Sequence, residues 1–312
     1  MEHTTAKMSC FARAYHSRNS PCPVFADTAA EALLGADFAQ IAQTLSAGVY
    51  FFLPEFTGTP EAGLRRIVDG QLAPSVLARS ALCENALAEA AAAGCRQYVL
   101  FAAGYDTFAI RNRDAALAVF ELDLPELLRD KRRRIAQAAL RSRAVDVPCD
   151  LTEPLWTKAL TARGYDPGAR TFGSMLGLSY YLREADFRAL LTGAAGVMPA
   201  GSTLCLDYPT AGESRSAAVN RALAEAAGER MQASYAPQEM QALLASCGFA
   251  VREEWGAEKM TQRFFAAHNR MVPDLPMAAP AGVQYLLAVR VGIAAPLSPD
   301  SRTGRARTRR RR

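Results

Sequence analysis

Long apolar runs are absent from this chain of 312 residues, although 50% of its residues are hydrophobic. No stretch approaches the roughly 18 consecutive apolar residues that a membrane-spanning helix needs. The first twenty residues carry scattered charges without an apolar core, so the sequence does not predict a secretory signal. The apolar content excludes a wholly disordered chain, because so much apolar surface would not stay solvated. We therefore expect a soluble, cytoplasmic, globular protein.

Histidine is scarce and the cysteines are scattered. None of the three histidines lies at metal-ligand spacing from a cysteine, so a structural zinc site is not expected. The seven cysteines are odd in number and contain no CxxC pair. This pattern predicts reduced thiols, buried as small hydrophobic side chains, and no metal centre.

The body of the chain has little net charge, and the formal +5 comes from one end. Seven arginines stand in the last eleven residues, and without them 29 basic residues face 31 acidic ones. We expect residues 296–312 to be a disordered, arginine-rich tail. Such a tail could bind nucleic acid or another acidic surface non-specifically, but a solvated tail without a defined role is the simpler interpretation.

Residue patterns divide the rest of the chain in two. Residues 1–94 are rich in alanine, and their patterns predict helices over 6–16, 27–34, 59–68 and 75–93. From residue 95 on, short apolar runs alternate with helical stretches, which is typical of βαβ units around a mostly parallel sheet. Strands are expected at 97–101, 117–123, 144–147, 170–176, 202–207, 249–254 and 283–291. Between them, one helix is expected to start at 125, and another to start after Thr152 as N-cap and end near 164. Further helices are expected over 184–195, 214–230 and 238–247. The sequence thus predicts a helical region at 1–94 packed on an α/β core at 95–295.

Polar residues and a glycine follow the first three predicted strands. In open α/β sheets, ligands bind where the carboxyl ends of strands meet. Gly104 would let a ligand approach the backbone closely, and Asp123 stands nineteen residues later, at a spacing suited to an acid that accepts hydrogen bonds from ribose. Asp150 could bind an adenine amine while Leu151 packs on the ring. Arg79, on the long helix before the first strand, could hold a carboxylate.

The turn after the first strand lacks a G-x-G-x-x-G motif, and so lacks the helix start that cradles a pyrophosphate. A dinucleotide therefore fits poorly. A cofactor with adenosine but no phosphate, S-adenosylmethionine, fits better. By spacing alone, the same acids could equally be caps or surface residues.

A series of short motifs runs in a consistent order across residues 12–290. The motifs are Ala12-Arg-Ala14, Pro23-Val-Phe-Ala-Asp27, Ala78-Arg-Ser80, residues 96–107, residues 119–125 with Lys131, Asp150-Leu151, Gly177 with Tyr181-Leu182, Gly201-Ser202 with Asp207-Tyr208, and Gly248-Phe249. Together they resemble the leucine carboxyl methyltransferase-like family of S-adenosylmethionine-dependent O-methyltransferases, which includes bacterial members linked to polyketide or other small-molecule O-methylation. The resemblance implies a class I methyltransferase (Rossmann-like) fold, with a seven-stranded, mostly parallel sheet, an N-terminal helical cap and a lid over the substrate.

The resemblance also implies individual roles in binding S-adenosylmethionine. Arg79 would hold its carboxylate, and Gly104 would approach its methionine part. Asp123 would bind the ribose, and Asp150 with Leu151 would frame the adenine. Substrate pockets in the family are built from variable lid and loop residues, here expected at 45–70 and 255–280.

Two positions depart from the family pattern. Ala102 stands where members usually have a glycine, which adds a methyl group where backbone and cofactor approach each other. Leu176 stands where members usually have a glutamate, so a carboxylate expected near the cofactor's amino group is missing. Since one charge-assisted hydrogen bond contributes about 1.5–3 kcal/mol, affinity could fall by one to two decades if nothing replaces it. Arg13 matches, loosely, a basic residue that closes over the cofactor.

The activity implied is methyl transfer to a carboxylate or hydroxyl oxygen of a small molecule. A carboxylate acceptor needs no base, whereas a phenol or alcohol would benefit from one. No pattern marks that base: His16, Asp207 and Tyr208 are candidates by position only, and Tyr181 could orient substrate or simply pack. The two departures keep open a second hypothesis, a catalytically degenerate protein that acts in ligand sensing or interaction.

Overall fold

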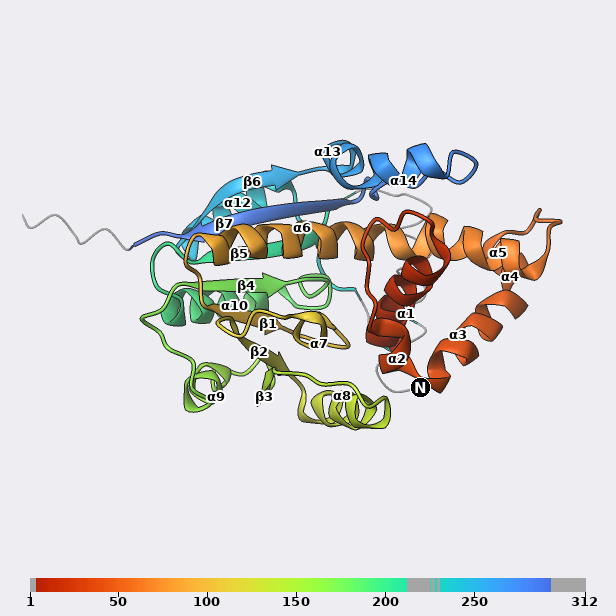
Figure 1. Ribbon diagram of the computed structural model, residues 1–312. Helices are drawn as coiled ribbons and strands as arrows, with labels where there is room; N and C mark the ends of the chain where they lie inside the picture. The colour runs from red at the N-terminus through yellow and green to blue at the C-terminus, as the bar shows by residue number, and fades with distance from the viewer. Residues whose placement is uncertain (1–3, 212–224, 226–227, 229–230, 293–312) are drawn as a thin grey trace, which may run out of the picture.

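The computed structural model describes residues 4–211, 225, 228 and 231–292, with a single β-sheet at its centre (Figure 1). Seven strands form this sheet in the order β3-β2-β1-β4-β5-β7-β6, and β7 runs antiparallel to both of its neighbours. The predicted seven-stranded, mostly parallel sheet is confirmed. The strands are β1 (Gln97–Phe101), β2 (Ala118–Asp123), β3 (Val145–Pro148), β4 (Thr171–Met175), β5 (Thr203–Pro209), β6 (Phe249–Trp255) and β7 (Val283–Arg290).

The two central strands, β1 and β4, are buried along their whole length. Every residue of β1 and of β4 is buried, as expected for parallel strands that are covered on both faces. The strand order reverses at this pair, because the chain runs from β1 to β2 on one side and returns to β4 on the other. A ligand crevice is therefore expected at the carboxyl ends of β1 and β4.

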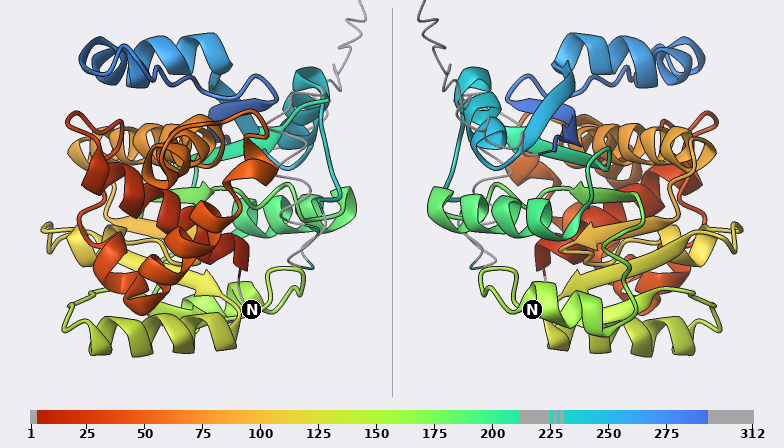
Figure 2. Two further views of the ribbon diagram at one scale, coloured as in Figure 1. Left: turned by 90° about the vertical axis from the view of Figure 1, so that its right-hand side faces the viewer. Right: turned by 90° about the vertical axis from the view of Figure 1, so that its left-hand side faces the viewer.

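Helices cover both faces of the sheet, and Figure 2 shows the layers from the ends of the strands. On one face, side chains from α9, α10 and α12 join a core with Val99, Phe101 and Leu204 of the strands. On the other face, α6 and α7 pack against Tyr98, Leu100 and neighbouring strand residues. The helices are α6 (Ala73–Ala92), α7 (Phe108–Arg111), α8 (Pro125–Gln137), α9 (Trp156–Ala162), α10 (Glu184–Val197) and α12 (Pro237–Ser246).

The N-terminal helices lie beyond the carboxyl ends of the strands (Figure 1). Their apolar side chains share one core with the segment between β6 and β7, including Met260, Phe265 and Met277. The two regions together cover the end of the sheet at which ligands bind. They comprise α1 (Thr4–Asn19), α2 (Ala30–Leu34), α3 (Ala36–Ala47), α4 (Val49–Phe52), α5 (Pro60–Ile67), the π-helical turn Val68–Leu72, α13 (Ala257–Met260), the π-helical turn Thr261–Phe265 and α14 (Ala266–Met271).

Several local predictions need correction. Helix α9 begins at Trp156 with Leu155 as N-cap, so Thr152 does not cap it; its amide and hydroxyl instead donate to Asp150 (2.8 and 2.7 Å). Helix α3 was not predicted. The segments 45–70 and 255–280, expected to build the substrate pocket as lids and loops, contain α4 and α5 in one case and α13 and α14 in the other, and of their residues only Pro280 lines the cavity described below. The tail at 296–312 lies outside the described residues, as does nearly all of the helix predicted at 214–230.

None of the helices in the described part of the chain combines the length and apolarity that a bilayer crossing requires.

Candidate functional site

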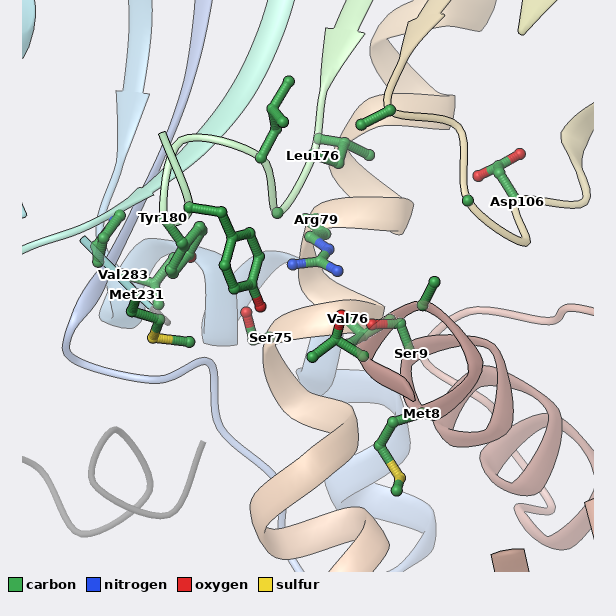
Figure 3. A pocket seen from close by; sticks show the side chains of 18 of the residues that line it. Met8, Ser9, Ser75, Val76, Arg79, Asp106, Leu176, Tyr180, Met231 and Val283 are labelled. Atoms are coloured by element: carbon green, nitrogen blue, oxygen red, sulfur yellow. The ribbon is translucent and has the colours of Figure 1, made fainter. Parts of the chain in front are cut away.

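A cavity of about 840 Å³ opens at the carboxyl ends of β1, β2 and β4, between the sheet, α1 and α6. Figure 3 shows side chains from these elements turned toward one another. The turns after β1 and β4, the end of β2 and the chain just before β7 complete the wall. Seven of the candidate site residues singled out in the sequence line this cavity, namely Arg13, Arg79, Ala102, Gly104, Asp123, Leu176 and Tyr181.

Asp123 and Gly104 are joined where β1 and β2 end. The amide of Gly104 donates to Oδ2 of Asp123 at 2.8 Å, and the amide of Leu124 donates to Oδ1 at 2.8 Å. Gly104 has a φ of +51°, in the left-handed region that glycine adopts without strain. A Cβ atom at this position would lie 3.5 Å from the Cβ of Ala6 on α1. The Asp123 carboxylate is thus held at the cavity wall, under helix α1.

Arg79 projects from α6 into the cavity, where its side chain is 16% exposed. Its Nη1 lies 3.5 Å from Oδ2 of Asp207, a fully buried residue of β5. Asp207 also accepts from the amide of Gly177 (2.6 Å) and from the hydroxyl of Tyr180 (2.9 Å). One buried carboxylate therefore joins the guanidinium, the turn after β4 and a tyrosine.

These contacts give Asp207, which the sequence offered as a candidate base, a structural role. Its carboxylate is engaged by three donors, so it orients Arg79 rather than accepting a proton from a substrate. Burial, and then the neighbouring Asp207, raise the pKa of Tyr180 well above its ordinary value, so the phenol stays a hydrogen-bond donor.

The other candidate bases lie away from the cavity. His16 is buried against Asp69 (Nδ1 to Oδ1, 2.8 Å), and its Nε2 accepts from the amide of Val24 at 3.1 Å. Tyr208 donates its hydroxyl to Glu254, and burial raises the pKa of this phenol. Among the described residues that line the cavity, only Tyr181 remains from the four side chains considered for catalysis.

Asp150 and Leu151 follow β3 but do not join the cavity wall. Asp150 is exposed, and its Oδ1 accepts from the amide and the hydroxyl of Thr152. Leu151 is partly buried against the core beneath the sheet. Their predicted contacts with an adenine stay predictions, on the same sheet edge as Asp123 but outside the cavity.

The two departures from the family pattern both line the cavity. Ala102 has a φ of +56°, so the backbone keeps the left-handed conformation that suits glycine although a methyl group is present. Leu176 presents an apolar side chain directly before Gly177, and it packs in part against the core below. The wall at this point is apolar rather than acidic.

Much of the wall was not predicted. Ser75 and Val76 precede Arg79 by four and three residues on α6, so helical spacing from Arg79 could have identified both. Met8 on α1 and Val283 at the start of β7 line the cavity as well, and no local pattern marks them. Met8, Val76 and Val283 add apolar side chains to a lining that also includes polar ones such as Ser9 and Ser75.

Comparison with known proteins agrees with this architecture. The family model of leucine carboxyl methyltransferases matches residues 6–195. A Bacillus subtilis (strain 168) protein named "Putative S-adenosyl-L-methionine-dependent methyltransferase YktD" is 31% identical over 277 residues, 84% of this chain and 91% of that protein. A relative from Frankia alni whose name carries the same description is 33% identical over 210 residues, 66% of this chain and 70% of the relative.

Among solved structures, a DUF574 family protein from Streptomyces avermitilis MA-4680 has a TM-score of 0.52 at 17% identity, covering 79% of this chain and 97% of that one. This likeness shows a shared fold. The family model covers well over half of the chain, and the resemblance seen in the ordered motifs is confirmed. The chain belongs to the leucine carboxyl methyltransferase family.

Proposed function

We propose that this S-adenosylmethionine-dependent methyltransferase transfers its methyl group to a carboxylate or hydroxyl oxygen of a small molecule. Membership of the family and the names of the relatives support the methyl donor. The single observation that carries the proposal is the cavity at the strand switch, with Arg79, Gly104 and Asp123 on its polar side. The cavity volume of about 840 Å³ lies within the range that is usual for small-molecule sites.

The residues present fit S-adenosylmethionine. Arg79 would pair with its carboxylate, because a guanidinium binds a carboxylate through two parallel hydrogen bonds. Asp123, fixed by two backbone amides, would accept from the ribose hydroxyls. The glycine conformation at Gly104 lets the methionine part approach the backbone. When bound, S-adenosylmethionine supplies a methyl group on a sulfonium, which an oxygen nucleophile can attack.

The chain itself contributes positioning and exclusion of water. The side chains of Met8, Val76 and Val283 give the lining apolar surface, against which part of an acceptor would be desolvated. No histidine or lysine lines the cavity within the described residues, and burial raises the pKa of Tyr105 and Tyr180. An acceptor oxygen that is already ionised, such as a carboxylate or an acidic phenol, would need no base here, whereas a less acidic hydroxyl would depend on a lining carboxylate such as Asp106 or Glu225.

Calorimetry with S-adenosylhomocysteine tests the donor site. The unchanged protein should bind, and Asp123→Ala should weaken binding at least tenfold, because a hydrogen bond to a charged group contributes about 1.5–3 kcal/mol. Asp114→Ala is the matched control, since Asp114 is exposed, lies off the cavity and also accepts a backbone amide. No heat and no thermal shift at millimolar ligand would contradict the donor site.

Transfer of labelled methyl from S-adenosylmethionine into a small-molecule extract tests catalysis. Label in an extracted compound, released as methanol by mild base from an ester but retained by an ether, would support O-methylation and identify the acceptor oxygen. Binding without transfer to any extract would favour the catalytically degenerate alternative, which the departures at Ala102 and Leu176 motivate.

A further inference from the structure

Asp27 lies at the centre of a buried polar network that joins the N-terminal helices to the turn after β1. Its side chain is fully buried. Oδ2 accepts from Nε of Arg13 at 2.8 Å, and Oδ1 accepts from the hydroxyl of Thr107 at 2.6 Å. Nε of Arg111 lies 3.4 Å from Oδ1, and the amide of Ala30 at the start of α2 donates to the same oxygen at 3.1 Å. Four elements of structure thus meet at one carboxylate.

Arg13 extends this network into the cavity wall. While Nε donates to Asp27, Nη2 donates to the backbone carbonyl of Tyr105 at 2.8 Å. Tyr105 stands between Gly104 and Asp106, and all three residues line the cavity. A single guanidinium therefore links the Asp27 carboxylate to the turn that forms the floor of the donor site.

The electrostatics keep this carboxylate charged. Burial alone would raise the pKa of Asp27, but Arg13 and Arg111, with the hydroxyl of Thr107, hold it below its ordinary value. Loss of the negative charge would leave the buried Arg13 guanidinium without its carboxylate partner, which is destabilising in a protein interior, whereas Arg111 also pairs with Glu84. The Asp27 carboxylate is therefore ionised at neutral pH.

We propose that Asp27 is a positioning residue of the donor site. Through Arg13 and Thr107 it holds α1 and residues 104–107 in one arrangement, so that the wall facing the methionine part of S-adenosylmethionine is formed before binding. Preorganisation of this kind raises affinity, because the wall is already ordered and loses little conformational entropy when the ligand binds. Asp27 does not line the cavity itself and acts through its neighbours. The inference rests on the proposed function, because it assumes that S-adenosylmethionine binds here.

Two ligands separate a positioning role from general stability. S-adenosylhomocysteine carries the amino-acid part, whereas 5′-methylthioadenosine keeps the nucleoside and the sulfur and lacks the amino-acid part. In calorimetry with the full chain, Asp27→Asn should lower affinity for S-adenosylhomocysteine about tenfold and affinity for 5′-methylthioadenosine by less than about threefold. A merely structural role would lower the thermal midpoint and leave the ratio of the two affinities unchanged.

Two further variants keep the test decisive if Asp27→Asn fails to fold. Thr107→Val removes the hydroxyl and should weaken S-adenosylhomocysteine selectively, whereas Thr107→Ser keeps the hydroxyl and should restore affinity. Arg18→Gln is the control, because Arg18 also joins α1 to α2 through Glu31, at an exposed site off the cavity.

The outcomes are distinct. Wild-type affinity for S-adenosylhomocysteine in folded Asp27→Asn, or in Thr107→Val if Asp27→Asn does not fold, overturns the inference alone. Equal losses for both ligands, or an equal loss in Arg18→Gln, overturn it as well. If the unchanged protein binds neither ligand, the proposed function fails, and the inference fails with it.

Discussion

Gly177→Ala adds a single methyl group and should lower the affinity for ligand by more than its effect on folding stability explains. Gly177 has a φ of +65°, in the left-handed region, and it directly follows Leu176 after β4. A Cβ atom there would lie 2.5 Å from Nη1 and 2.8 Å from Cζ of Arg79. The guanidinium of Arg79 must therefore move, and any movement changes its contact with Asp207.

Two separate effects are expected in Gly177→Ala. The left-handed backbone costs an L-residue about 1–2 kcal/mol, which corresponds to a fall of roughly 1.5–3 °C in the thermal midpoint of a chain of this size. Displacement of Arg79 removes the cation that would pair with the donor's carboxylate. A bond of that type contributes about 1.5–3 kcal/mol, so affinity for S-adenosylhomocysteine should fall tenfold to a hundredfold.

Gly164→Ala separates the two effects. Gly164 has a φ of +90°, and a Cβ atom there would meet nothing within 4 Å, so this variant has the backbone cost without the clash. Both variants should lose thermal stability in scanning calorimetry, and only Gly177→Ala should lose affinity in titration calorimetry. Unchanged affinity in Gly177→Ala, or a matching loss in Gly164→Ala, would refute the role assigned to Arg79.

Three further outcomes follow from the structure. Ala102→Gly should raise stability by up to about 1 kcal/mol in urea unfolding, because it relieves a left-handed alanine at φ +56°; an unchanged midpoint would show that the lost methyl packing offsets the relief. Asp207→Asn should destabilise the fold by about 3–5 kcal/mol and weaken S-adenosylhomocysteine binding, since it leaves Arg79 beside a neutral group; loss of stability without loss of affinity in the folded fraction would argue against a link between the two. Burial, opposed by a bond to the carbonyl of Cys22, lowers the pKa of His268 below 6.5, so the unfolded chain takes up the proton first and stability should fall as pH drops below that value. His268→Asn, which can still donate to that carbonyl, should show a shallower decline in thermal midpoint between about pH 6.5 and 5, and parallel curves would assign the decline to other groups.

Much of the sheet could be predicted, because each strand is marked by a pattern of residues within the strand itself. Strand β1 has the bounds 97–101 expected from its apolar run, since a strand buried on both faces needs apolar residues at consecutive positions. Helix α3 was missed because only Ile41 and Leu45 of its twelve residues are buried, which leaves little apolar periodicity to detect. The π-helical turn at Val68–Leu72 has no such pattern either.

The sequence by itself determined the fold class, the family and the residues at strand ends. Each of these depends on hydrophobic periodicity or on short motifs, which involve residues that are close together in the chain. Only the tertiary structure decided what those residues do together. Asp207 was a candidate base by its position alone, and the structure shows it in contact with Arg79, 128 residues away in the chain. Asp27 and Thr107 meet across 80 residues. Such contacts depend on how α1 and α6 dock onto the carboxyl end of the sheet, and docking is set by the packing of whole surfaces rather than by any local run of residues.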